Sequence, residues 1–294
     1  MCGIAGIYYF SRKPADALRT VQAMARTIAH RGNDDRGVFE NDCLVLAHQR
    51  LSVIDLDTGH QPMSNEDGSV TVVYNGEIYN YKELRSDLRA RGHVFSTSSD
   101  TEVLVHLYES YGMDLFNRLN GIFTFAMWDD RRKKLILARD HFGVKPLHVR
   151  VGPNRVVFAS EIKAILASTN MTPSINRQAV HYFMNLRYVP GKHTLFQGIE
   201  RLLAGQYLIV DSTGVRKGSF YETPGPTRAV LSEQKAVAGI RDRLSAAVSR
   251  QLVSDVPLGI YLSGGMDSSS ILAMAGLARP KESFFTYTLG FNEP

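Results

Sequence analysis

Short apolar runs separated by polar clusters fill residues 1–210. Short apolar runs rich in β-branched and aromatic residues predict β-strands, whereas apolar residues spaced three and four apart predict amphipathic helices. Strands are predicted at residues 3–10, 44–48, 51–55, 70–74, 122–128, 134–140 and 156–160. Helices are predicted at residues 16–29, 81–91, 103–111 and 162–167. Because strands and helices do not alternate regularly, the pattern predicts a layered α+β domain of antiparallel sheets over residues 2–210.

The pattern changes after residue 210. Residues 211–230 are rich in Gly, Pro, Ser and Thr, which predicts a linker. A helix, an apolar strand, a glycine turn, a second helix and a second strand follow, at residues 232–254, 257–262, 263–265, 268–277 and 283–289. A β-α-β unit belongs in a parallel sheet, so a second, α/β domain is predicted over residues 231–294. One such unit cannot form a sheet with both faces covered, so this domain is expected to be incomplete.

Composition supports a two-domain globular protein. The chain has 294 residues, of which 44% are hydrophobic and 21% charged, an ordinary balance for soluble domains. No apolar run reaches the roughly 18 residues of a membrane span, and the N-terminus lacks a signal-peptide pattern. A cytoplasmic protein without membrane contact is therefore expected. The net charge of +5 is mild and dispersed, so no nucleic-acid partner is predicted.

The chain has two cysteines, Cys2 and Cys43, and a cytosolic protein gives little reason to expect a disulfide between them. No Cys/His spacing is typical of a zinc site, so no structural metal is predicted. Cys2 follows the initiator methionine, which aminopeptidases tend to remove before a small side chain. A thiol and a free α-amine would then share one residue, as in N-terminal nucleophiles. The alternative is an ordinary buried thiol at a frayed chain end.

The strongest local motif is the octet Leu262-Ser263-Gly264-Gly265-Met266-Asp267-Ser268-Ser269. Its glycines lie between a predicted strand and a predicted helix, where backbone N–H groups converge on an anion. The alternative is a turn with an ordinary Ser or Asp helix cap. The Gly-Lys-Ser/Thr ending of a Walker A loop is absent. The octet resembles the pyrophosphate loop of ATP pyrophosphatases, and this resemblance implies an ATP site at Leu262, Ser263, Gly264, Gly265, Asp267, Ser268 and Leu289.

Six further motifs precede this octet in a fixed order. They are Cys2-Gly3-Ile4, His30-Arg31-Gly32, residues 47–52 (AHQRLS), residues 75–80 (NGEIYN), residues 99–102 (SDTE) and residues 139–143 (RDHFG). Together they resemble the class II glutamine amidotransferase domain of glutamine-hydrolysing asparagine synthetases, and the resemblance runs from Cys2 to the end of the chain. It implies a four-layer αββα sandwich of antiparallel sheets, of the N-terminal-nucleophile hydrolase type, followed by a parallel-sheet ATP-pyrophosphatase domain.

The resemblance also implies roles for individual residues. Cys2 would be the nucleophile, and the Asn75 side chain and Gly76 N–H would stabilise the oxyanion. Free glutamine carries a carboxylate and an ammonium, so a pocket for it needs one cation and one anion. The implied glutamine-binding residues are Arg50, Leu51, Val53, Asn75, Gly76, Glu77 and Asp100. Taken singly, Arg50 could be a surface charge, Asp100 the N-cap of the helix at 103–111, and Asn75-Gly76 a hairpin turn.

The implied activity has two halves. Glutamine is hydrolysed to glutamate and ammonia, and ammonia then aminates an acyl-adenylate made from a carboxylate and ATP with Mg²⁺. Aspartate is the default acceptor, and a sugar acid, a peptide or an antibiotic precursor are the alternatives. A glutaminase subunit that feeds a partner chain, and a glutamine-sensing paralogue, are the competing hypotheses. Full asparagine synthetases continue for a couple of hundred residues, so a fragment of a longer protein is expected, and a homodimer is compatible with the resemblance.

Overall fold

The structure is a computed structural model that describes residues 1–169, 172–225 and 231–290. It divides into two compact units, Met1–Glu222 and Thr223–Pro294. No helix within the described residues has both the length and the apolarity to cross a bilayer. The predicted boundaries at residues 210 and 231 remain predictions.

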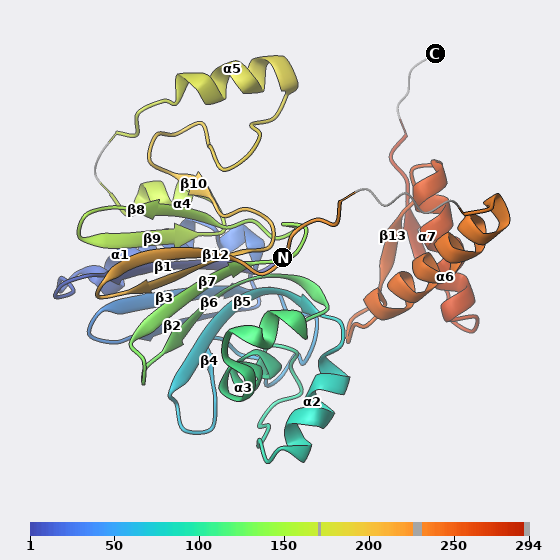
Figure 1. The fold of residues 1–294 in the computed structure, drawn as a ribbon, viewed down its shortest axis with the longest axis horizontal. Coiled ribbons are helices and arrows are strands. Elements are labelled where there is room, and N and C mark those ends of the chain that lie inside the picture. Colours follow the sequence, from blue (N-terminus) through green and yellow to red (C-terminus); the bar gives the residue numbers. More distant parts are fainter. Residues whose placement is uncertain (170–171, 226–230, 291–294) are drawn as a thin grey trace. The chain divides into compact units, whose positions relative to one another are not determined.

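The first unit is built on two six-stranded sheets in which all paired strands are antiparallel (Figure 1). The first sheet has the order β10 (Glu200–Arg201), β8 (His148–Val151), β9 (Arg155–Ala159), β1 (Gly3–Tyr9), β3 (Leu44–Arg50) and β2 (Asp35–Glu40). The second has the order β12 (Gly214–Ser219), β11 (Gln206–Asp211), β7 (Lys134–Arg139), β6 (Gly121–Asp129), β5 (Val70–Ile78) and β4 (Met63–Ser64).

The main core lies between these two sheets, and β1 shows why. All seven residues of β1 are buried, although successive side chains point to opposite faces. Ile4 and Tyr8 pack in the cluster that holds Trp128 of the second sheet. Ala5 and Ile7 pack in a second cluster with the helix on the outer face. A central strand covered on both sides therefore has an almost continuous apolar sequence.

Helices cover the outer faces of both sheets. The helices α1 (Ala17–Thr27) and α4 (Ile162–Ala167) contact each other and the first sheet, while α2 (Tyr81–Ala90) and α3 (Glu102–Tyr111) lie on the second (Figure 1). The predicted four-layer αββα sandwich is thereby confirmed. The unit also contains α5 (Arg177–Leu186) and the 3₁₀ helices Ala29–Arg31 and Gly112–Asn117.

Two predictions about residues 1–230 are wrong. The predicted strand at 51–55 is a loop that follows β3. There the Asp55 carboxylate accepts from the Thr58 N–H at 3.0 Å, and Asp55 has a φ of 54°, which is turn geometry. Part of the predicted linker is the edge strand β12, paired with β11. The Gly- and Ser-containing stretch is a hairpin at the sheet edge, where exposed side chains remove the apolar signal. Residues 226–230 lie outside the described residues.

The second unit contains α6 (Glu233–Gln251), β13 (Gly259–Tyr261), α7 (Met266–Ala278) and β14 (Phe285–Tyr287). The Ser232 hydroxyl caps α6 by accepting from the Lys235 N–H at 3.4 Å. β13 and β14 pair in parallel, which confirms the α/β pattern expected for this part of the chain. Its small core is centred on Val248, Leu252 and Ala275.

Candidate active site

Strand ends of both sheets bring the residues expected to bind glutamine to one cleft. Cys2 immediately precedes β1, and Arg50 ends β3, which pairs with β1. Asn75 lies in the second half of β5, in the other sheet. The cleft is lined by Cys2, Arg50, Leu51, Val53, Asn75, Gly76, Glu77 and Asp100, together with Met1, Ile54, Gly59, Gln61, Tyr74, Ser99, Thr101 and Lys145.

Hydrogen bonds from neighbouring segments hold Cys2 in place directly before the first residue of β1. The Leu51 N–H donates to Sγ at 3.4 Å, and the Arg31 Nε donates to the Cys2 carbonyl at 2.9 Å. Arg31 is itself anchored by the Glu161 carboxylate at 2.9 Å. Burial raises the pKa of the Cys2 thiol, although the Leu51 N–H and the positive chain terminus oppose this. The thiol is therefore protonated near neutral pH and needs a base to become a nucleophile.

Asn75 is a buried donor without a partner. It is 1% exposed, and its Nδ2 has no hydrogen-bond acceptor among the described residues. Leaving such a donor unpaired costs roughly 1–3 kcal/mol. Because Asn75 lines the cleft, this nitrogen is available to an oxygen of a bound ligand.

Gly76 stands where only a glycine fits. A Cβ added there would lie 2.2 Å from the Ile122 carbonyl oxygen and 2.7 Å from the Phe123 Cα, both in the paired strand β6. Gly76→Ala is therefore expected to force β5 and β6 apart and to lower the free energy of unfolding by about 2 kcal/mol or more. Urea denaturation checks this prediction. Gly68→Ala is the contrast, because nothing lies within 4 Å of a Cβ built at Gly68. Any cost of that change comes from the positive φ of 73° and not from a clash.

Arg50 is buried and its guanidinium is already engaged. Its Nη1 donates to the Leu56 carbonyl at 3.3 Å, and its Nη2 donates to the carbonyls of Ile54, at 3.2 Å, and Asp55. The side chain thus holds the loop after β3 against the sheet and forms one wall of the cleft. A ligand carboxylate at this wall would share these donors with the loop carbonyls. The predicted carboxylate contact remains a prediction.

Asp100 does not cap the helix that follows it. α3 begins at Glu102, and Thr101 occupies the N-cap position. The Asp100 Oδ2 accepts instead from the Tyr74 hydroxyl at 3.0 Å and the Ile78 N–H at 2.9 Å. These two donors on β5 turn the carboxylate away from the helix. Burial raises the pKa of Asp100, and it also raises that of neighbouring Glu77, to which Asp100 adds repulsion.

Asp100→Asn is expected to separate binding from stability. A pKa raised in the folded state means that the charge opposes folding, so this cost appears as the pH rises above the unfolded pKa of 3.8. The neutral side chain of Asn removes this cost of burying a charge. Its amide oxygen can still accept from the Tyr74 hydroxyl and the Ile78 N–H. The free energy of unfolding at pH 7 should therefore be unchanged or higher, whereas KM for glutamine should rise about 10²-fold. Denaturation and steady-state kinetics measure the two effects, and an unchanged KM would contradict the assignment.

Lys145 is a cleft residue that the sequence analysis missed. It is 7% exposed; burial lowers its pKa, while the nearby Glu77 and Cys2 oppose the shift. The turn that presents it is organised by Asp140, whose carboxylate accepts from the N–H groups of Val144 and Lys145, each at 3.0 Å. The available signal was the motif at residues 139–143, which ends two residues before the lysine.

The glycine octet connects β13 to α7. Gly264 has a φ of 79°, and no atom lies within 4 Å of a Cβ built on it. The Ser268 hydroxyl accepts from the Ser263 N–H at 3.2 Å and draws the turn against the start of α7. Leu262 to Gly265 form the turn, and Asp267 and Ser268 lie in the first turn of α7. Phosphate binding at this turn remains a prediction. Leu289 follows β14 and is 80% exposed.

Comparisons with known proteins agree with the two units. Residues 1–221 match the family model of the glutamine amidotransferase domain, and residues 239–294 match that of asparagine synthase. Asparagine synthetase (glutamine-hydrolyzing) 3 of Bacillus subtilis (strain 168) is 38% identical over 300 residues, which cover 100% of this chain and 48% of that protein. Amidase chry2 of Gibberella zeae is 36% identical over 290 residues, which cover 93% of this chain and 42% of that protein. The chain therefore spans about half the length of the curated relatives it matches.

Among solved structures, the fold is similar to that of glutamine phosphoribosylpyrophosphate amidotransferase from B. subtilis. The TM-score is 0.53 at 19% identity, and the match covers 98% of this chain and 65% of that chain. At this level of identity the likeness concerns the fold alone.

Proposed function

This chain belongs to the glutamine amidotransferase domain family, and on that premise we propose that Cys2 hydrolyses glutamine to glutamate and ammonia. The observation that carries the proposal is the cleft itself. It combines a thiol, an unpaired amide donor, a buried guanidinium and a buried carboxylate within one pocket. Free glutamine offers one group for each of these: the amide carbon for the thiol, the amide oxygen for the amide donor, the α-carboxylate for the guanidinium and the α-ammonium for the carboxylate.

The reaction begins with the transfer of the Cys2 proton to an adjacent base. Sγ then attacks the amide carbon, and the oxygen that becomes negative is stabilised by the Asn75 Nδ2 and the Gly76 N–H. The C–N bond breaks, ammonia leaves with the proton, and a glutamyl thioester remains. Water hydrolyses this thioester to glutamate and restores the thiol.

The base in this proposal is the α-amine of Cys2, which becomes free only when Met1 is removed. Met1 is 58% exposed and lines the cleft. Burial lowers the pKa of the ammonium at the present chain terminus, and nearby Lys145 and Arg31 act in the same direction. If the Cys2 amine keeps these surroundings once Met1 is removed, a larger fraction of it is unprotonated near neutral pH and free to accept the thiol proton.

The direct test is a glutaminase assay on the purified chain, together with intact-mass analysis. We expect the form without Met1 to release glutamate and ammonia in equal amounts. A form that retains Met1 should be inactive. If the processed chain releases no ammonia from glutamine, the proposal fails.

For the complete protein we propose amide synthesis, in which this ammonia aminates an acyl-adenylate formed from ATP with Mg²⁺ and a carboxylate. The match of residues 239–294 to the asparagine synthase model and the glycine turn that connects β13 to α7 support this. Aspartate is the default acceptor. Relatives that carry the name amidase, such as Amidase chry2, support other carboxylates as a second candidate.

Carboxylate-dependent exchange between ATP and pyrophosphate in the complete protein tests this second half. Exchange with aspartate supports asparagine synthesis. Exchange only with another carboxylate would identify that carboxylate, and not aspartate, as the acceptor. Absence of exchange with every acid tested would contradict amide synthesis and leave a glutaminase that serves a partner chain.

A further inference from the structure

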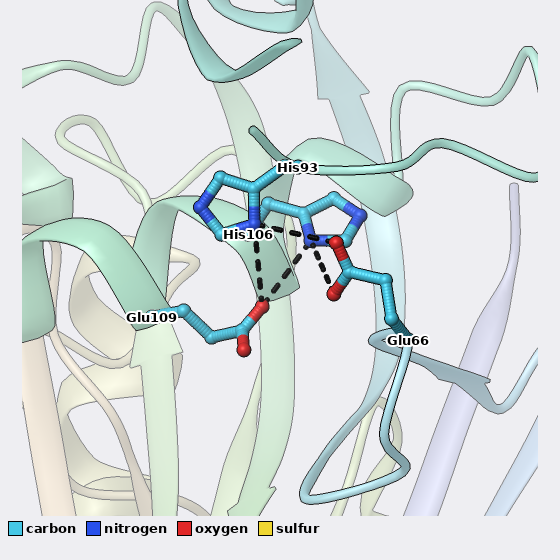
Figure 2. A group of neighbouring side chains, drawn as sticks. All are labelled: Glu66, His93, His106 and Glu109. Atoms are coloured by element: carbon cyan, nitrogen blue, oxygen red, sulfur yellow. Dashed lines mark hydrogen bonds and ion pairs between the residues drawn. The ribbon is translucent and has the colours of Figure 1, made fainter. Parts of the chain in front are cut away.

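A second group of reactive side chains lies outside the cleft, beside the N-terminal sheets (Figure 2). Glu66 belongs to the turn between β4 and β5, and His93 follows α2. His106 and Glu109 lie one turn apart on α3. One ligand atom from each residue can be chosen so that all four lie within 4.8 Å of one another.

The histidine–carboxylate distances within this group are close to the separations of ligands around one small ion. With one ligand atom taken from each residue, the separations reach up to 4.8 Å, so the side chains would move inward as an ion binds. The His93 Nδ1 lies 3.4 Å from the Glu66 Oε1 and 3.7 Å from the Glu109 Oε2. The His106 Nδ1 lies 3.4 Å from the Glu66 Oε2 and 3.2 Å from the Glu109 Oε2. Tetrahedral Zn²⁺ with bonds of roughly 2.0–2.2 Å sets its ligand atoms about 3.3–3.6 Å apart. Figure 2 shows both imidazoles turning Nδ1 toward both carboxylates.

One of the two opposite ring nitrogens has the kind of partner that metal-binding histidines usually have. The His93 Nε2 lies 2.8 Å from the Ser110 hydroxyl, and such an outer partner fixes the tautomer and leaves Nδ1 free to bind a metal. The His106 Nε2 is buried without a hydrogen-bond partner among the described residues, and the Glu102 carboxylate lies 3.7 Å from it. Glu102 is itself held by the N–H and hydroxyl groups of Ser96 and Thr97.

Residues outside the group of four also orient the two carboxylates. The Glu109 Oε1 accepts from the Asn65 Nδ2 at 2.7 Å, which leaves Oε2 to face the histidines. The Glu66 Oε1 accepts from the Val94 N–H at 2.9 Å. The side chains of Glu66 and Glu109 are 35% and 22% exposed, whereas that of His106 is fully buried. An ion could therefore enter from the carboxylate side.

We propose that Glu66, His93, His106 and Glu109 bind one divalent first-row transition-metal ion, with Zn²⁺ as the best fit to two imidazoles and two carboxylates. Four protein ligands make a closed, structural site rather than a catalytic one. The ion would fasten α3 to the β4–β5 turn and to the segment after α2. The sequence analysis predicted no metal, because the ligands come from three separate segments and show no short-range spacing.

The competing explanation is an ion-pair network in which both histidines are protonated and hold the carboxylates without a metal. The two explanations differ in what they predict for added metal. A network gains nothing from Zn²⁺, whereas a metal site gains stability as the ion binds the folded state.

The test uses the 294-residue chain without a polyhistidine tag, dialysed against a chelator. We expect calorimetry to detect one Zn²⁺ per chain, with a Kd below about 1 μM, and thermal melting to show a higher Tm in its presence. Co²⁺ in the same site should give the visible absorption of a tetrahedral complex. His93→Gln and Glu109→Gln should weaken Zn²⁺ binding at least about 100-fold.

These two variants spare the fully buried His106, and circular dichroism establishes that they fold. The matched control is His181→Gln, an exposed helical histidine of α5, which should bind Zn²⁺ as the unmodified chain does. The proposal is overturned if the unmodified chain binds no stoichiometric metal. It is equally overturned if the His93 and Glu109 variants bind Zn²⁺ as tightly as the His181 control.

Discussion

Cys2→Ala is expected to lower the rate of glutamine hydrolysis by more than about 10³-fold, which is the largest effect of any single change in this chain. Without Sγ no thioester can form, and the remaining polar groups of the cleft can only polarise the amide. The folded state should be kept, because Sγ makes two hydrogen bonds, both to the Leu51 backbone. It donates to the carbonyl at 3.6 Å and accepts from the N–H at 3.4 Å, and it bonds no other segment among the described residues. Steady-state release of glutamate measures the effect.

Cys43→Ala is the matched control for this change. Cys43 is the other free thiol, and it lies partly buried against the core between the sheets, outside the cleft. Its loss should reduce stability slightly and leave glutaminase activity intact. Activity that survives in Cys2→Ala, or disappears equally in Cys43→Ala, would show that Cys2 is not the nucleophile.

The second large effect is expected at Asn75. Asn75→Ala removes one of the two proposed oxyanion donors and should lower kcat by about 10²–10³-fold with little change in KM. The free energy of unfolding should be unchanged or higher, because the variant removes a buried Nδ2 that has no partner among the described residues. Kinetics and urea denaturation of the same preparation measure both quantities.

Asn65→Ala provides the contrast for stability. Asn65 is also buried, but its Nδ2 donates to Asp67, Ser69 and Glu109, and its Oδ1 accepts from the Val70 N–H. This variant should be clearly destabilised, because it breaks a satisfied network. If Asn75→Ala is destabilised to the same extent, the unpaired donor is structural, and the oxyanion assignment loses its support.

The order of local elements was largely predictable because its causes are local. The apolar run of β1 and the three- and four-residue spacing in α1 each come from one short segment. The strand–turn–helix–strand pattern of the second unit was predictable for the same reason. The edge strand β12 was not, since its sequence GVRKGS holds a single large apolar residue and shows no apolar period.

The candidate site also has one part that the sequence predicted and one part that it did not. The order of six motifs pointed to Cys2, Asn75 and Asp100, and the cleft brings these residues together. The partners of Asp100 could not be predicted, because the Tyr74 hydroxyl and the Ile78 N–H approach from a strand more than twenty residues earlier. Lys145 was missed because its place in the cleft depends on how the Asp140 turn lies against the sheets.

By itself, therefore, the sequence determined which segments become strands and helices, which residues carry reactive groups, and which family the chain resembles. Only the tertiary structure decided that the Asn75 Nδ2 is unpaired, that Arg50 bonds the loop carbonyls, and that two histidines meet two glutamates beside α3. The physical reason is that propensity and periodicity act between near neighbours in the chain. Burial and hydrogen-bond partners depend on which strands pair and which layers stack, and these contacts join residues far apart in sequence.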